Sequence, residues 1–137
     1  MAISLLPPET PMPEPKRRRP WGDKFRDALR GLKLGIRGHS SFAVHFFFAV
    51  LVTIAGIALG CGVEEWCLLV LAIGMVLTAE LFNSAIETLF RGLDPDTKER
   101  SWPALDIAAG AVLMASFTAI IIGAAVFIRR VLALWGW

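Results

Sequence analysis

The sequence predicts an all-α integral membrane protein with an N-terminal amphipathic interfacial helix and three transmembrane helices. Hydrophobic residues make up 55% of the 137 positions and charged residues only 19%, and the mean hydropathy is +0.60. The apolar residues form long runs instead of the short periodic clusters of a soluble domain. The longest, residues 107–128, has 22 positions without a charge. As a helix it spans roughly 30 Å, the thickness of a bilayer core.

Residues 1–20 are expected to be a disordered, basic, proline-rich tail on the cytoplasmic side. This segment holds six of the eight prolines, which forbid a stable helix, and it has no apolar core long enough for a signal peptide. Its basic cluster, Lys16 to Arg19, is most simply a topology signal beside anionic headgroups. The membrane domain is then residues 21–137.

Residues 21–38 are predicted to form the interfacial helix. Basic residues alternate there with apolar residues that recur at spacings of three or four, which is typical of a helix lying in the membrane interface. The apolar positions are Trp21, Phe25, Leu29, Leu32 and Ile36.

The three spans are expected at residues 42–60, 65–90 and 106–130, with a cytoplasmic loop at 91–105. The second span has only 14 apolar positions, 66–79, before Glu80, so its helix must continue through polar residues. Before residue 42 there are nine Lys or Arg against four Asp or Glu, which places the N-terminus in the cytoplasm. Arg129 and Arg130, at the far end of the third span, mildly oppose this rule.

The stretch "AELFNSAIET", residues 79–88, puts polar side chains inside the second span. At 100° per residue, four of them and the later Arg91 lie on one stripe of about 100° of arc, which makes a stripe of five polar residues. They are Glu80, Asn83, Ser84, Glu87 and Arg91. Such residues are rare at membrane depth and usually functional, although they could also cross-link helices by hydrogen bonds. The deeper Glu80 suits a general base, and the shallower Glu87 suits a hard divalent cation such as Mg²⁺.

The loop at 91–105 is polar and charged, with Asp94-Pro95 and Trp102-Pro103 as expected turns. It could cover a phosphorylated cosubstrate, or it could be a solvated connector. Asp106 is expected to open the third span at the level of Glu87, where an N-cap or first-turn acid is the ordinary interpretation. Cys61 and Cys67 do not form a metal-type Cys/His cluster, and no nucleic-acid partner is expected.

The segment "ELFNSAIE" matches the pattern E-x-x-N-[ST]-A-I-E, and "DIAAGAVL" begins 19 residues after Glu87. With the upstream "FRDALRGLKLGIRGHSSFAVH", these motifs resemble the prokaryotic-type diacylglycerol kinase family, which includes undecaprenol kinases. The resemblance covers roughly residues 22–130. It implies a homotrimer in the bacterial inner membrane that transfers phosphate from ATP, with Mg²⁺, to a membrane lipid. Diacylglycerol is the first expected acceptor and undecaprenol the alternative.

The resemblance also implies roles for individual residues. Glu80 would be the catalytic base, Asn83 would orient it, and Glu87 would hold the metal that bridges the ATP phosphates. The lipid would meet Glu80 together with Ser41, Phe42 and His45. The nucleotide would meet Glu87 together with Asp96, Thr97, Lys98 and Asp106. No G-x-x-x-x-G-K-[ST] nucleotide loop is present.

Three positions depart from the family pattern. His39 stands where a second metal-binding glutamate is expected, and imidazole favours Mn²⁺ or Zn²⁺ over Mg²⁺. Arg91 replaces an aspartate and Leu105 replaces a phosphate-contacting lysine. Arg91 could supply the positive charge that is lost with this lysine and so help to bind ATP. These departures leave open a catalytically impaired relative that acts as a membrane scaffold or lipid-binding protein. A transporter is disfavoured because the acids cluster at one end of the spans.

Overall fold

The computed structural model describes residues 20–37 and 40–136, and these ranges contain four α-helices and no strand. They are α1 (Trp21–Arg37), α2 (Ser40–Ala58), α3 (Val63–Arg91) and α4 (Pro95–Leu134). The last three are long and apolar enough to cross a membrane, which confirms the predicted fold class. Apart from Pro20, the expected tail lies outside the described residues.

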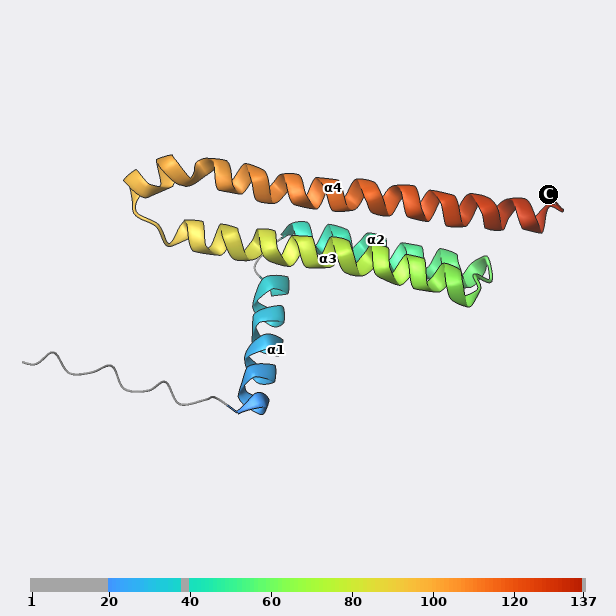
Figure 1. Ribbon diagram of the computed structural model, residues 1–137, viewed down its shortest axis with the longest axis horizontal. Coiled ribbons are helices and arrows are strands. Elements are labelled where there is room, and N and C mark those ends of the chain that lie inside the picture. The colour runs from blue at the N-terminus through green and yellow to red at the C-terminus, as the bar shows by residue number, and fades with distance from the viewer. Residues whose placement is uncertain (1–19, 38–39, 137) are drawn as a thin grey trace, which may run out of the picture.

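The helices α2, α3 and α4 lie side by side, and α1 projects from the side of this bundle (Figure 1). α3 packs against each of the other three helices and most extensively against α4. α1 approaches α3 at Gly35, where an added Cβ would lie 2.6 Å from Cδ2 of Leu81. A larger residue at this crossing would require the Leu81 side chain to move. With the bundle upright in a membrane, α1 would lie along the interface with Trp21 and Phe25 exposed.

The turn between α2 and α3 lies two residues earlier than the sequence predicts, at residues 59–62 instead of 61–64. α2 ends at Ala58 instead of residue 60, and Gly60 adopts a φ of +63°, a conformation that favours glycine. α3 begins at Val63 instead of residue 65. Its start is stabilised because the backbone N–H of Gly62 donates to Oε2 of Glu65 at 2.6 Å.

The expected loop at 91–105 is wrong over most of its length, since α4 already begins at Pro95. Asp94 is the N-cap, and its Oδ1 accepts a hydrogen bond from the backbone N–H of Thr97 at 3.1 Å. Pro95 then occupies the first helical turn, where its missing N–H costs nothing. Pro103 lies inside the helix, so the expected turn there is also wrong. The neighbouring Trp102 ring packs edge-on against Phe90 at 5.5 Å between centroids and ties α4 to α3.

The interior of one chain is small and centres on the contact between α3 and α4. Leu69 and Ala72 are buried on α3, and four residues are buried on α4. Those four are Ala108, Val112, Ala115 and Val126. Small residues allow two helices to approach closely without the hydrophobic driving force of water. Most other apolar side chains of the three long helices remain exposed and are available to lipid or to other copies.

Candidate active site

Glu80 is the buried centre of the polar stripe on α3. The residue is only 1% exposed. Its Oε1 accepts a hydrogen bond from the hydroxyl of Ser41, and its Oε2 lies 3.8 Å from Nε2 of His45. Ser41 and His45 are one turn apart on α2 and therefore share a face. A carboxylate is costly to bury without partners, and here α2 supplies them.

Glu87 lies two turns further along the same face of α3. Its Oε1 accepts from Nδ2 of Asn83 at 3.0 Å, and its Oε2 accepts from a guanidinium nitrogen of Arg91 at 3.3 Å. Exposure rises along the stripe, because the Glu87 side chain is 36% exposed and that of Arg91 is 61% exposed. The stripe thus runs from the interior of the chain to its surface.

The amide of Asn83 donates to Glu87, and no hydrogen bond joins it to Glu80 among the residues that the structure describes. The implied role of orienting Glu80 therefore has no direct contact behind it here. Ser84 is buried beside it, and its hydroxyl has no hydrogen-bond partner among the described residues. The sequence places Ser84 on the stripe but gives it no role.

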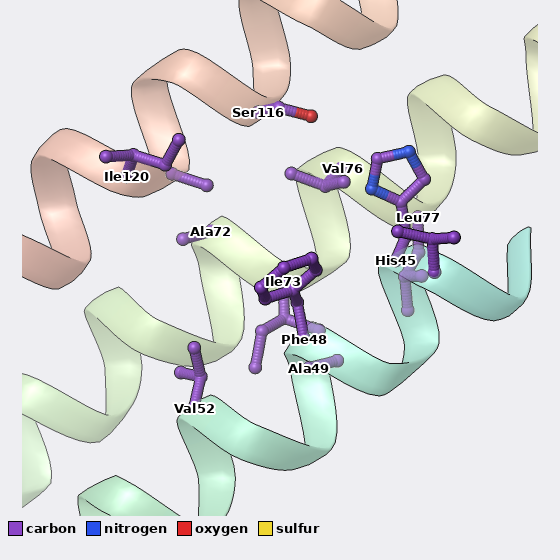
Figure 2. A pocket seen from close by; sticks show the side chains of 12 residues that line it. His45, Phe48, Ala49, Val52, Ala72, Ile73, Val76, Leu77, Ser116 and Ile120 are labelled. Carbon is purple, nitrogen blue, oxygen red and sulfur yellow. The ribbon is translucent and has the colours of Figure 1, made fainter. Parts of the chain in front are cut away.

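An apolar groove of about 280 Å³ lies between α2, α3 and α4 and reaches the site at His45 (Figure 2). Sequence reasoning missed this groove, since it forms only when three separate helices pack. His45 and Ser116 are its polar side chains, and the hydroxyl of Ser116 has no partner in residues 20–37 and 40–136. The apolar lining is Val44, Phe48, Ala49, Val52, Ala72, Ile73, Val76, Leu77, Ala119 and Ile120.

The groove and the carboxylate share His45. This side chain both lines the groove and faces Oε2 of Glu80. An amphiphile whose apolar chain occupied the groove would therefore carry its polar end towards Glu80. Phe42, which the resemblance implies for lipid binding, is only 4% exposed and lies in the protein interior.

The residues expected to bind the nucleotide begin in the first turn of α4. Asp96 is exposed, Lys98 is half-buried, and the N–H of Thr97 is engaged by the Asp94 cap. Hydrogen bonds from the hydroxyl and the backbone N–H of Thr97 lower the pKa of Asp94. This stabilises the negative charge beside the positive end of the helix dipole.

Asp106 does not open a helix, because it lies three turns inside α4. The expectation that Asp106 is an N-cap or first-turn acid is therefore wrong, because the helix starts at Pro95. Its side chain is exposed and forms no hydrogen bond or ion pair with the described residues. His39, the residue on which the expected Mn²⁺ or Zn²⁺ preference rests, lies outside the described part of the chain.

The acids of the stripe fit a cation that arrives with its own phosphate ligands. Within residues 20–37 and 40–136, no group of three or more His, Cys, Asp or Glu side chains could hold a metal ion. Mg²⁺ usually takes one or two carboxylates and completes its shell with water and substrate phosphates. Glu87, half-exposed and supported by the Asn83 amide, suits this use.

Comparisons with known proteins identify the family of the chain. The family described as prokaryotic diacylglycerol kinase matches residues 26–127. The undecaprenol kinase of Bacillus subtilis (strain 168) is 31% identical over 106 residues, which are 77% of this chain and 86% of that protein. The diacylglycerol kinase of Synechocystis sp. (strain ATCC 27184 / PCC 6803 / Kazusa) is 31% identical over 111 residues, 80% of this chain but only 63% of that protein.

No solved structure matches the chain significantly. The family match covers most of the chain, including the whole polar stripe on α3. The chain therefore belongs to the prokaryotic diacylglycerol kinase family and is a lipid kinase.

Proposed function

We propose that this chain transfers the γ-phosphoryl group of ATP to the hydroxyl of diacylglycerol, with Glu80 as the general base. The observation that carries the proposal is the position of Glu80. It is a carboxylate 1% exposed, bonded to a hydroxyl and placed where an apolar groove meets the polar stripe. A lipid alcohol needs an apolar surface for its chain and, next to it, a group that can accept the proton of its hydroxyl.

The Ser41 hydroxyl indicates how an alcohol can approach Glu80, because it already donates to Oε1. The lipid hydroxyl would donate to the same carboxylate from the side of His45 and the groove. Its proton would pass to Glu80 as its oxygen attacks the γ-phosphorus and ADP departs. Proton transfer to a positioned base contributes about 10²- to 10⁴-fold to such a reaction.

The nucleotide would occupy the shallower half of the site. Glu87 would hold the Mg²⁺ that neutralises phosphate charge when bound, and Asn83 would keep the Glu87 carboxylate oriented. Asp96, Thr97, Lys98 and Asp106 would contact ATP from α4. Catalysis would then depend mainly on positioning and charge neutralisation, as is usual in phosphoryl transfer.

Arg91 would supply a cation to the nucleotide half of the site. Its guanidinium lies 3.3 Å from Glu87 and is well exposed, so it can reach a phosphate oxygen without leaving the stripe. Guanidinium groups bind phosphate through paired hydrogen bonds. The positive charge of Arg91 would thus compensate for the lysine charge that is lost at Leu105.

The assembly in the membrane is part of the proposal. The N-terminus would be cytoplasmic in a bacterial inner membrane, and three copies would associate. Support comes from the many apolar side chains that α2, α3 and α4 leave exposed in one chain. The basic excess before residue 42 supports the orientation.

Undecaprenol is the second candidate acceptor. The relative named undecaprenol kinase is covered by this chain over 86% of its length, more than the relative named diacylglycerol kinase at 63%. Both acceptors present a primary hydroxyl on an apolar body, so the chemistry of the groove does not favour one over the other.

Label transfer from [γ-³²P]ATP by the purified chain in a lipid mesophase tests the proposal. Short-chain diacylglycerol and undecaprenol would be offered separately, each with Mg²⁺, Mn²⁺ or Zn²⁺. We expect label in diacylglycerol with Mg²⁺. Label only in undecaprenol would show that undecaprenol, and not diacylglycerol, is the acceptor. No transfer to either lipid with any ion would overturn the proposed reaction and favour the scaffold interpretation.

A further inference from the structure

A second groove lies at the end of the bundle opposite the candidate active site, beside the turn between α2 and α3. It encloses about 510 Å³ between α3 and α4 and shares no lining residue with the groove at His45. One wall is apolar and belongs to the membrane-spanning parts of the helices. It consists of Leu68, Ile121, Ile122, Ala125 and Val126.

The rim of this groove carries two consecutive acids from α3 and two consecutive arginines from α4. They are Glu64, Glu65, Arg129 and Arg130. The formal charge of the rim is therefore zero. A separate hollow continues past the same arginines towards Leu132 and Ala133, so the charged rim is open on two sides.

One acid and one arginine of the rim are already used by the fold. Arg130 donates from Nε to the carbonyl of Leu59 at 3.0 Å and from a terminal nitrogen to the carbonyl of Gly60. It thereby satisfies carbonyls at the end of α2. Glu65 accepts the N–H of Gly62 at 2.6 Å, and its Oε2 lies 3.8 Å from Arg130.

The other acid and arginine of the rim do not stabilise the fold through such contacts. Glu64 and Arg129 are exposed, and neither forms a hydrogen bond or ion pair with the residues described. Arg129 also stands at the end of the spans where positive charge is disfavoured. The kinase site does not explain it, since that site lies at the other end of α3.

We propose that this groove binds a phospholipid whose headgroup carries both a phosphate and a primary ammonium, such as phosphatidylethanolamine. Arg129 pairs with the phosphate, Glu64 accepts hydrogen bonds from the ammonium, and an acyl chain covers the apolar wall. Charge complementarity selects this occupant. An anionic headgroup gains Arg129 but is repelled by Glu64, and a quaternary ammonium has no N–H to donate. The site is separate from the reaction and goes beyond the proposed function.

Native mass spectrometry of the full chain released from nanodiscs measures this binding directly. The nanodiscs would contain phosphatidylethanolamine, phosphatidylglycerol or phosphatidylcholine, and the variants would be Glu64→Gln, Arg129→Gln and their combination. The combination Glu99→Gln with Arg100→Gln is the matched control, because it neutralises an exposed acid and arginine near the start of α4.

We expect phosphatidylethanolamine to be retained at least about fivefold more than the other two lipids, and this preference to vanish in the double variant but not in the control. Equal retention of all three lipids, or a preference that survives the double variant, would overturn the proposal. A change in the number of copies without a change in lipid retention would also overturn it, since the groove would then be an interface between copies. The readout is independent of phosphoryl transfer, so an inactive kinase does not affect it.

Discussion

Ser41 on α2 donates its hydroxyl hydrogen to Oε1 of Glu80 on α3, although 39 positions separate the two residues in the chain. His45 approaches the second carboxylate oxygen from the next turn of α2. The candidate base is therefore positioned by a different helix from the one that carries it. Because His45 also lines the apolar groove, it joins the groove to the polar stripe.

Replacing Ser41 should slow the reaction without unfolding the protein. Ser41→Ala removes the donor to Oε1 and lets the Glu80 carboxylate rotate, so we expect kcat to fall about tenfold, the effect of a hydrogen bond to a charged group. Ser41→Thr keeps the hydroxyl and should retain most of the activity. Thr118→Ala is the matched control, because the Thr118 hydroxyl bonds only within its own helix, at 2.9 Å to the Met114 carbonyl. Equal kcat values for Ser41→Ala and Thr118→Ala would contradict the positioning role.

Replacing Arg91 should weaken ATP binding more than it slows turnover. Arg91→Ala removes a charge-assisted contact, and we expect the KM for ATP to rise about fivefold to tenfold. Arg91→Lys should restore only part of the affinity, because a point charge cannot bind phosphate in the paired way. The half-exposed pair with Glu87 adds little to stability. Arg30→Ala, which breaks a comparable exposed pair with Asp27 on α1, is the control. An unchanged KM for ATP would remove Arg91 from the nucleotide site.

Asp94 should make the first turn of α4 sensitive to pH. The hydrogen bonds from Thr97 lower its pKa in the folded chain. A carboxyl group with a lowered pKa stabilises the folded state above its ordinary pKa, near 4. This contribution is lost as the pH falls through the lowered value. Hydrogen exchange at the amides of Thr97, Lys98 and Glu99 should therefore accelerate as the pH drops through that range, after correction for the intrinsic exchange rate.

Two variants separate the charge of Asp94 from its capping role. Asp94→Asn should keep the cap and lose the pH dependence, whereas Asp94→Ala should exchange faster at every pH. Corrected exchange that is independent of pH in the unmodified chain would show that the cap does not depend on the ionised carboxylate.

Gly56 should resist replacement because α2 and α3 approach each other closely there. An added Cβ would lie 3.0 Å from the Trp66 ring and 3.3 Å from Cδ1 of Leu69. We expect Gly56→Ala to destabilise the protein by about 1 kcal/mol in detergent unfolding titrations, at the lower end of overpacking costs. At Gly123, nothing lies within 4 Å of the added Cβ. Gly123→Ala should thus be neutral or stabilising, and equal effects of the two substitutions would contradict the close contact.

The helices and the polar stripe were predictable because both follow from local periodicity. A run of apolar residues long enough for a bilayer, and polar residues at spacings of three and four, need no knowledge of the tertiary structure. The start of α4 was also within reach of the sequence, because Asp94 and Pro95 form a helix-start pair. Pro103 misled the prediction, since α4 continues through it.

The contacts that complete the site could not be predicted in the same way. The pairing of Ser41 and His45 with Glu80, and the choice of Glu87 as the partner of Asn83, depend on how helices meet and on side-chain rotamers. The groove at Ser116 needs three helices at once. An unpartnered buried hydroxyl, such as that of Ser84, has no signature in a single sequence.

The most direct test of the central claim is the rate of label transfer to short-chain diacylglycerol by Glu80→Gln, compared with the unmodified chain. Glutamine fills the same space and accepts the Ser41 hydrogen bond, but it cannot take a proton from the lipid. We expect turnover to fall about 10²- to 10⁴-fold while the helical content and the number of copies stay unchanged. Glu99→Gln, at an exposed carboxylate on α4, should keep full activity. Turnover by Glu80→Gln equal to that of Glu99→Gln would contradict the account, because Glu80 would then be a structural residue.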